Sequence, residues 1–171
     1  MEQTSVLRAA IVVAVAGLLD AVVVPYLTFG FFSPRLTLIA VVFAVCPLRD
    51  LQAVLLGFFG GILLDALGSD LFGVGALGGL LAAMLASRAS AVRRKGAERV
   101  LLAQVVGIAV AGYDLLGYTA RWLAGLAVPQ LGEYAVGGVF PDAVINALIA
   151  FLVGGWLLNV VNIKTPHGWE K

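Results

Sequence analysis

Residues 55–77 read LLGFFGGILLDALGSDLFGVGAL, and this stretch decides the fold. It holds two apolar segments rich in glycine, separated by a short polar turn at residues 68–70. Residues four apart share one face of a helix, and small residues on that face let two membrane helices approach closely. The stretch therefore predicts an antiparallel helical hairpin. The residues expected to pack it, and to offer a docking face to a partner helix, are Gly57, Gly61, Asp65, Gly73, Gly75 and Gly79.

The rest of the chain is equally apolar. Of its 171 residues, 61% are hydrophobic and 12% are charged, with a mean hydropathy of +1.04. Soluble proteins carry about 25% charged residues. Prolines and charges divide the chain into six apolar segments at about 6–24, 34–46, 51–67, 71–87, 100–123 and 141–161. We therefore expect an all-α membrane protein, a single polytopic domain (1–171) built as a bundle of about six transmembrane helices.

The second segment is short. Its 13 residues begin with Pro34 at the first helical position, and Ser33 precedes them as a helix N-cap. They rise about 20 Å, less than the roughly 30 Å of the hydrocarbon core. The alternative is a re-entrant segment that does not cross.

The distribution of basic residues favours six crossings. With the N-terminus in the cytoplasm, only Arg35 and Arg121 of the 11 basic residues lie on the outer side. Inner loops of membrane proteins carry an excess of Lys and Arg. A re-entrant second segment would divide these charges between the two sides. We expect both termini to be cytoplasmic.

Polar residues from several helices are predicted near the outer surface. They are Asp20, Asp65, Asp114, Arg121, Asp142 and Asn146. A lipid-facing carboxylate is costly, so Asp114 should face the bundle interior, with Arg121 as a candidate partner. Two interpretations stay open: independent residues at helix ends, or a polar cluster around a shallow cavity, with Arg35 as a further counter-charge.

A basic loop joins the fourth and fifth segments. It carries Arg88, Arg93, Arg94, Lys95 and Arg99. We expect it to fix the topology and to contact anionic lipid. Contact with a cytoplasmic filament is the alternative.

Residues for catalysis are scarce. The chain has one histidine, His167, and one cysteine, Cys46. A zinc site of the usual Cys/His type and a Ser-His-Asp triad are therefore not expected. The net charge of +1 does not suggest a nucleic-acid partner. We expect no enzyme, no cofactor and no metal.

Residues 55–77 resemble the core motif of the bacterial rod shape-determining MreD family. That motif is a glycine-spaced helix ending in Leu-Asp (Leu64-Asp65), a short turn, and a small-residue helix. The stretch Ser33-Pro34-Arg35-Leu36 is similar to the family's Pro-Asp-Leu segment, although Arg35 stands where an acidic residue is usual. Asn146-Ala-Leu is similar to the family's asparagine-bearing last helix.

The resemblance implies a non-catalytic scaffold of the cell-elongation machinery in the bacterial inner membrane, which regulates cell shape and peptidoglycan synthesis. Its implied partners are an MreC-like single-span protein, the glycosyltransferase RodA with its penicillin-binding transpeptidase, and MreB filaments. The family is also similar in fold to the S components of energy-coupling vitamin transporters. The alternative function is therefore the substrate-binding component of a vitamin or metal transporter.

Overall fold

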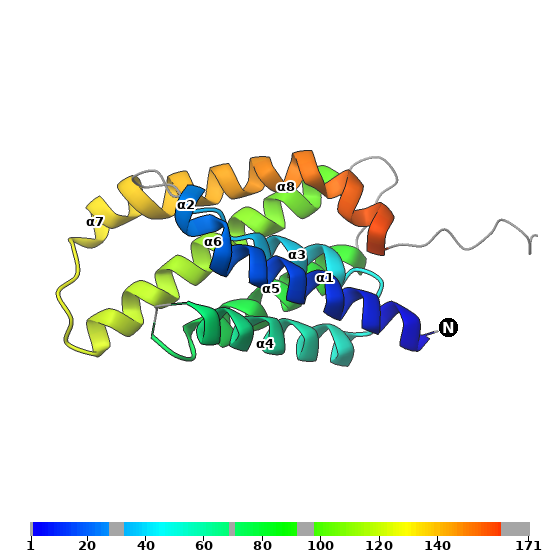
Figure 1. Ribbon diagram of the computed structural model, residues 1–171. Helices are drawn as coiled ribbons and strands as arrows, with labels where there is room; N and C mark the ends of the chain where they lie inside the picture. The colour runs from blue at the N-terminus through cyan, green and yellow to red at the C-terminus, as the bar shows by residue number, and fades with distance from the viewer. Residues whose placement is uncertain (1, 28–32, 69–70, 92–97, 162–171) are drawn as a thin grey trace, which may run out of the picture.

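The computed structural model describes residues 2–27, 33–68, 71–91 and 98–161, and the regular elements among them are all helices, with no strand (Figure 1). The elements are α1 (Glu2–Val22), α2 (Val24–Leu27), α3 (Leu36–Ala44), α4 (Asp50–Leu67), α5 (Val74–Ala91), α6 (Glu98–Leu123), α7 (Leu131–Tyr134), the π-helical turn η1 (Ala135–Val139) and α8 (Phe140–Val161). The predicted all-α membrane fold is confirmed.

Four helical segments are long and apolar enough to cross a membrane. They are Val6–Tyr26, Asp50–Leu67, Arg99–Leu123 and Leu131–Val161. The apolar part of α5, Val74–Ser90, is shorter. Helix α3 has only nine residues and rises about 14 Å, so it is too short to span the hydrocarbon core by itself.

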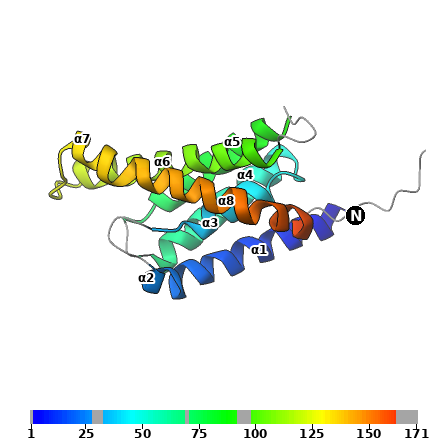
Figure 2. The ribbon, with the colours of Figure 1, turned by 90° about the horizontal axis from the view of Figure 1, so that it is seen from above.

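The long helices run along one axis of the molecule (Figures 1 and 2). Helix α4 packs against α5, and α6 packs against both α5 and α8. Helix α1 covers α3 and α4 from the other side. The described chain therefore forms a bundle of roughly aligned helices around a short central one.

Helix α3 is that central helix. It contacts α1, α4, α5, α6 and α8, and every residue from Thr37 to Ala44 is buried. A helix that is hydrophobic on all sides belongs inside a protein, which explains the unbroken apolar run LTLIAVVFA. The predicted start at Pro34, with Ser33 as N-cap, is wrong, because Arg35 occupies the N-cap position and gives no side-chain cap. Acceptors from other helices replace the local cap, as described below.

Helix α5 also begins later than predicted, at Val74 rather than Leu71. Gly73 has φ +102°, a left-handed backbone conformation that breaks the helix just before this point. Its N–H donates to the Asp65 carboxylate at 2.9 Å. The connection between α4 and α5 therefore ends at Gly73, whose backbone conformation leads directly into the first residue of α5.

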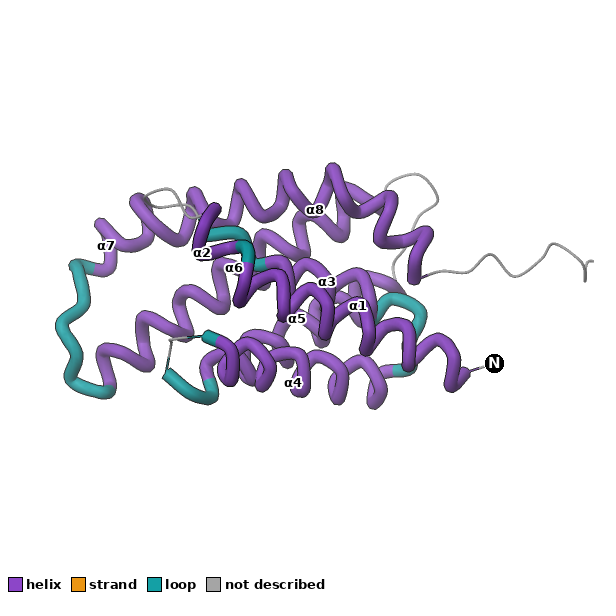
Figure 3. The backbone as a smooth tube through the Cα atoms, in the orientation of Figure 1, coloured by secondary structure: helices purple, strands orange, loops and turns teal. Residues whose placement is uncertain are grey.

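The last helical run differs most from the prediction. A loop was expected up to residue 140, but α7, η1 and α8 form one continuous run from Leu131 to Val161. Pro141 lies inside this run instead of starting a helix, although proline lacks an N–H and crowds the preceding turn. The π-helical turn η1 stands directly before it, with the Phe140 N–H donating to the Ala135 carbonyl five residues back. Such a turn has a wider hydrogen-bond spacing, and it adapts the helix to the proline. Figure 3 shows the loop that joins this run to α6.

At the other end, α1 stops at Val22, slightly before the predicted residue 24, and α2 follows at once. Pro25 lies within α2, at its second residue. Proline is tolerated in the first turn of a helix because its missing N–H would have no intrahelical partner there. The first helical segment, predicted to end at residue 24, therefore continues through a single turn residue, Val23, to the end of α2 at Leu27.

Candidate functional site

Four glycines form the contact between α4 and α5. Gly57, Gly61, Gly75 and Gly79, here called the glycine seam, are all buried. A methyl group on Gly61 would overlap the Gly75 carbonyl and the Ala76 backbone, and one on Gly79 would overlap the Gly57 carbonyl. Close backbone approach of this kind is what small residues provide in membrane helices. Because the seam is closed, a partner helix could use these glycines only if α4 and α5 separated.

Asp65 closes the same hairpin at the end of α4. Its carboxylate accepts the N–H of Gly75 at 2.7 Å and the N–H of Ala76 at 3.0 Å, besides that of Gly73. The first N–H groups of a helix have no partner within the helix, and the helix dipole favours a negative charge there. Asp65 therefore caps α5 from the preceding helix, and it is itself buried.

Asp20 of α1 makes the equivalent cap on α3. One carboxylate oxygen accepts the N–H of Leu36 at 2.8 Å, and the other accepts the N–H of Thr37 at 2.7 Å. The Thr37 hydroxyl also donates to this carboxylate. Since Leu36 and Thr37 are the first two residues of α3, the capping group that the local sequence lacks comes from α1.

Two residues of α8 hold the segment just before α3. The Asn146 side-chain oxygen accepts the Arg35 N–H at 2.7 Å, and its amide group donates to the Ser33 carbonyl at 3.2 Å and the Asp142 carbonyl at 2.9 Å. Asp142 accepts the Ser33 N–H at 3.2 Å. Asn146 is fully buried. The backbone of residues 33–37 is therefore fixed by side chains from both ends of the chain.

Arg35 links the same segment to α6. Its guanidinium lies 3.5 Å from a carboxylate oxygen of Asp114, which is 5% exposed, and 4.7 Å from the centre of the Tyr113 ring. An ion pair and a cation–π contact both favour the charged guanidinium in a partly buried place. The sequence offered Arg121 as the partner of Asp114. The ion pair that the structure shows joins Asp114 to Arg35, since the start of α3 lies beside α6 at this level.

The predicted polar residues thus gather around one short segment, the backbone of residues 33–37 and the Arg35 side chain. Asp20, Asp114, Asp142 and Asn146 each contact a residue of the segment 33–37. Asp65 serves α5 separately. Arg121 lies in the last turn of α6 with an exposed side chain. We call the region of these two helix starts, residues 33–37 and 73–76, the capped end.

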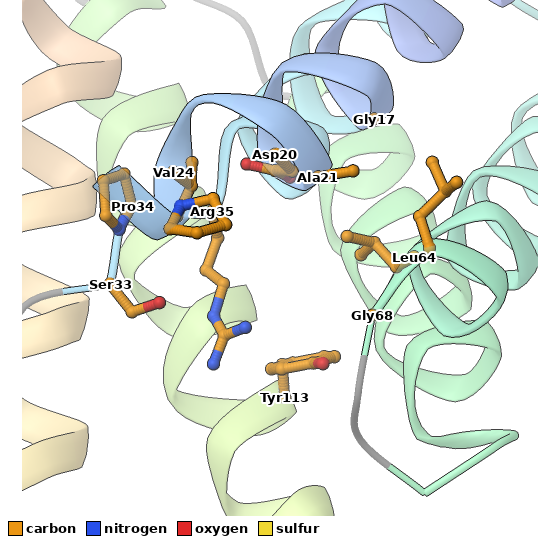
Figure 4. Close-up of a pocket in the computed structure, with 12 residues that line it drawn as sticks. Gly17, Asp20, Ala21, Val24, Ser33, Pro34, Arg35, Leu64, Gly68 and Tyr113 are labelled. Atoms are coloured by element: carbon orange, nitrogen blue, oxygen red, sulfur yellow. The ribbon is translucent and has the colours of Figure 1, made fainter. Parts of the chain in front are cut away.

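A cavity of about 440 Å³ opens at the capped end (Figure 4). The Arg35 guanidinium reaches into it, with the Tyr113 ring close by and Asp20 on another side. Small residues line part of this cavity and leave space for it, among them Gly17 and Ala21 of α1 and Gly68, which follows α4. The described residues contain no group of three or more His, Cys, Asp or Glu that could hold a metal ion.

The basic loop falls mostly outside the described residues, which include neither Arg93, Arg94 nor Lys95. Arg88 lies near the end of α5, and Arg99 is the second residue of α6. The Arg99 guanidinium packs against Gly155 of α8, where a methyl group would lie 2.6 Å from it. Both arginines stand at the end of the bundle opposite to the capped end.

The sequence missed the part played by residues 33–37 as the point of convergence. Arg35 was noted only as a counter-charge, and Thr37 was not noted at all. Their signal was the unusual Ser33-Pro34-Arg35-Leu36 before an apolar run too short to cross, because a buried helix start requires acceptors from elsewhere.

Comparison with known proteins gives one match. The family model described as rod shape-determining protein MreD matches residues 2–162 of the 171-residue chain. Neither the curated proteins nor the solved structures contain a match.

Proposed function

The chain belongs to the MreD family of rod shape-determining proteins, and from this membership we propose that it is a non-catalytic scaffold of the cell-elongation machinery. In this role it docks partner membrane proteins, first among them an MreC-like single-span protein. RodA with its penicillin-binding transpeptidase, and MreB filaments, complete the proposed set. Through them the chain regulates cell shape and peptidoglycan synthesis.

The contacts of the polar side chains within the bundle support this proposal. Asp20, Asp65, Asp142 and Asn146 each accept backbone N–H groups of another segment, and Asp114 pairs with Arg35. Buried carboxylates in catalytic sites are directed toward a substrate or a proton to be moved. Here they hold helices in fixed positions, which is the requirement of a rigid docking platform.

The proposal includes an orientation in the bacterial inner membrane. Both termini and the loop between α5 and α6 lie on the cytoplasmic side, and the capped end lies on the outer side. The excess of Lys and Arg at the opposite end supports this arrangement. Reporter fusions that are active only outside the cytoplasm should be silent after residue 95 and active after residue 127.

Co-purification tests the scaffold directly. The full chain, tagged at its C-terminus, should retain a co-expressed MreC-like protein from the same genome through detergent extraction. A single-span coiled-coil protein of unrelated origin serves as the matched control and should be lost. In cells lacking the chain, its return should restore rod shape. Retention of neither protein, or rounded cells after its return, contradicts the scaffold.

The cavity at the capped end favours a second candidate function, the substrate-binding component of a vitamin transporter. Ligand sites in proteins enclose about 300–1,000 Å³ and combine apolar walls with a few polar groups, and the cavity has this size and this mixture. A ligand at 100 times its Kd would stabilise the fold by about 2.7 kcal/mol. Thermal unfolding with a panel of vitamins tests this candidate, and a scaffold without a ligand gives no shift with any of them.

A further inference from the structure

The segment that joins α6 to α8 is attached loosely to the bundle. It comprises the loop after Leu123, α7 and the π-helical turn η1. Among the described residues, the backbone of α7 packs only against η1, the turn that follows it, whereas α4, α5, α6 and α8 each pack against several helices. Figure 1 shows α7 standing apart from the nearby end of α6, with the loop between them. We call residues 126–136 the strap.

Side chains, rather than backbone packing, hold the strap to α6. The rings of Tyr118 and Tyr134 stack with their centres 5.0 Å apart. The Tyr118 hydroxyl donates to the Pro129 carbonyl at 3.0 Å, and the Tyr134 hydroxyl donates to the Asp114 carbonyl at 3.4 Å. Every residue of the strap is exposed or half-buried. Few contacts therefore have to break for the strap to leave α6.

Three features that bend helices coincide where the strap joins α8. Gly137 and Gly138 are adjacent, both belong to the π-helical turn η1, and Pro141 follows shortly after them. Helices kink at proline, at pairs of glycine or serine residues and at π-helical turns. The junction is therefore a bending point in the helical run from Leu131 to Val161.

Neither glycine of this junction is required by packing. Outside its own stretch of chain, a methyl group on Gly137 would meet no atom within 4 Å, and one on Gly138 would meet only the Tyr134 ring, at 3.6 Å. Neither has a positive φ. Glycine inside a helix is less stable than alanine because it leaves the backbone more freedom. Backbone freedom is therefore what these two residues contribute.

The other end of the strap also begins at a glycine. Gly125 has φ +71°, in the left-handed region, and a methyl group there would meet no atom within 4 Å. It separates the strap from the end of α6 at Leu123. Hinges are a few positions in loops or at the ends of helices that absorb changes in φ and ψ. The strap thus lies between two junctions of this kind.

The strap meets α6 at the level of a buried ion pair. Tyr134 reaches the Asp114 backbone, and the Asp114 carboxylate lies 3.5 Å from the Arg35 guanidinium. The Asp114 side chain is 5% exposed. Departure of Tyr134 would therefore bring water and small solutes closer to this carboxylate.

We propose that the strap opens and closes as a hinged unit, bending at its two glycine junctions, and so controls access to the Arg35–Asp114 ion pair. In the closed state Tyr134 stacks on Tyr118. In the open state the two rings separate and Asp114 is accessible from the side of α7. This inference requires neither a partner nor a ligand, and it is independent of the proposed scaffold function.

Distances between spin labels test the movement. One label is attached at Thr119→Cys, exposed on α6, and the other at Glu133→Cys, exposed in the strap, with Cys46→Ser removing the native thiol. Pulsed EPR of the chain in lipid nanodiscs should show a short and a longer distance. Gly137→Ala with Gly138→Ala should reduce the longer population about fivefold for each glycine, because alanine favours the helical backbone.

A variant and a control pair complete this measurement. Tyr134→Ala removes the ring stack and the hydroxyl, so it should raise the longer population. Labels at Ile108 and Leu148, which are 59% and 57% exposed on α6 and α8, should give one distance in every variant, because these two helices pack directly against each other. A single distance between positions 119 and 133 that Tyr134→Ala leaves unchanged overturns the movement. A longer population that the alanine pair does not reduce overturns the hinge.

Chemical labelling tests whether the strap covers the ion pair. A carbodiimide with glycine ethyl ester modifies accessible carboxyl groups, and mass spectrometry locates the product. Tyr134→Ala should speed the modification of Asp114 about tenfold, since one ring stack and one hydrogen bond are lost, and the alanine pair should slow it. Asp65 is the matched control, because it is 8% exposed and lies in the α4–α5 hairpin, so its rate should not change. Equal rates at Asp114 in all three chains would show that the strap does not cover the ion pair.

Discussion

The Asp65 carboxylate accepts the N–H of Gly75 at 2.7 Å, and a methyl group on Gly75 would lie equally close, 2.7 Å from the same oxygen. The bond therefore requires both an acid at the end of α4 and the absence of a side chain at the start of α5. One contact thus accounts for two positions in the sequence, ten residues apart.

Replacing Asp65 by asparagine should destabilise the fold. The amide keeps one acceptor oxygen, but its NH₂ group faces backbone N–H donors that now lack a partner. Loss of a helix cap costs about 0.5–2 kcal/mol, and a buried unsatisfied donor costs about 1–3 kcal/mol. Thermal unfolding in detergent, followed by circular dichroism, should show a lower Tm. Asp50→Ala is the control, because Asp50 is exposed and its carboxylate accepts a hydrogen bond from the half-buried Ser87 hydroxyl, not from the start of a helix. Equal Tm values for the two variants would refute the cap.

Gly61→Ala tests the glycine seam. The added methyl group would overlap the backbone of α5, and overpacking of this kind costs about 1–3 kcal/mol. Gly117→Ala in α6 is the matched control, because a methyl group there would meet only Val74 at 3.8 Å. Alanine is the better helix former, so this second variant should gain up to about 1 kcal/mol. The measurement is the fraction of folded protein after heating, and opposite signs for the two variants are expected.

Asn146→Ala should loosen the start of α3. The change leaves the Arg35 N–H and the Ser33 carbonyl without their present partner and opens a small cavity. Each buried polar group left unsatisfied costs about 1–3 kcal/mol. Hydrogen exchange in detergent should become faster at residues 35–38 and stay unchanged at residues 57–61 of α4, the stretch between two glycines of the seam. Unchanged protection at residues 35–38 would show that Asn146 does not hold this segment.

Arg35 and Asp114 should behave as a coupled pair. Removing one partner of a buried ion pair leaves an uncompensated charge and costs roughly 3–5 kcal/mol, whereas replacing both by apolar residues is often close to neutral. Arg35→Met and Asp114→Leu should each lower the Tm more than the double substitution does. Additive effects in this double-mutant cycle would mean that the two side chains contribute independently.

Much of the fold follows from hydropathy and glycine spacing. The α4–α5 hairpin lies within one contiguous stretch, so its packing residues are all visible in residues 55–77. The continuous run from Leu131 could not be predicted, because proline normally begins or breaks a helix. The π-helical turn before Pro141 lets the helix continue through the proline. The wider hydrogen-bond spacing of this turn leaves no clear signal in the sequence.

The sequence predicted which residues form the polar site, but it did not predict which partner each of them contacts. Hydropathy shows that Asp20, Asp114, Asp142 and Asn146 lie within apolar helices, where each needs a polar partner. Which partner each one takes depends on how α1, α6 and α8 surround α3. That arrangement is a property of the tertiary structure and cannot be read from the sequence. Charge alone suggested Arg121 as the partner of Asp114, whereas the ion pair in the structure is with Arg35.

The cap on α3 has a consequence for biosynthesis. Ser33 and Arg35 donate to Asp142 and Asn146, which follow them by 109 and 111 residues. A ribosome has therefore translated most of the chain before these acceptors exist. Until the last helix enters the membrane, the backbone before α3 must keep other partners, such as water or the insertion machinery. The contacts of Ser33 and Arg35 with α8 can therefore form only after the last helix has been synthesised.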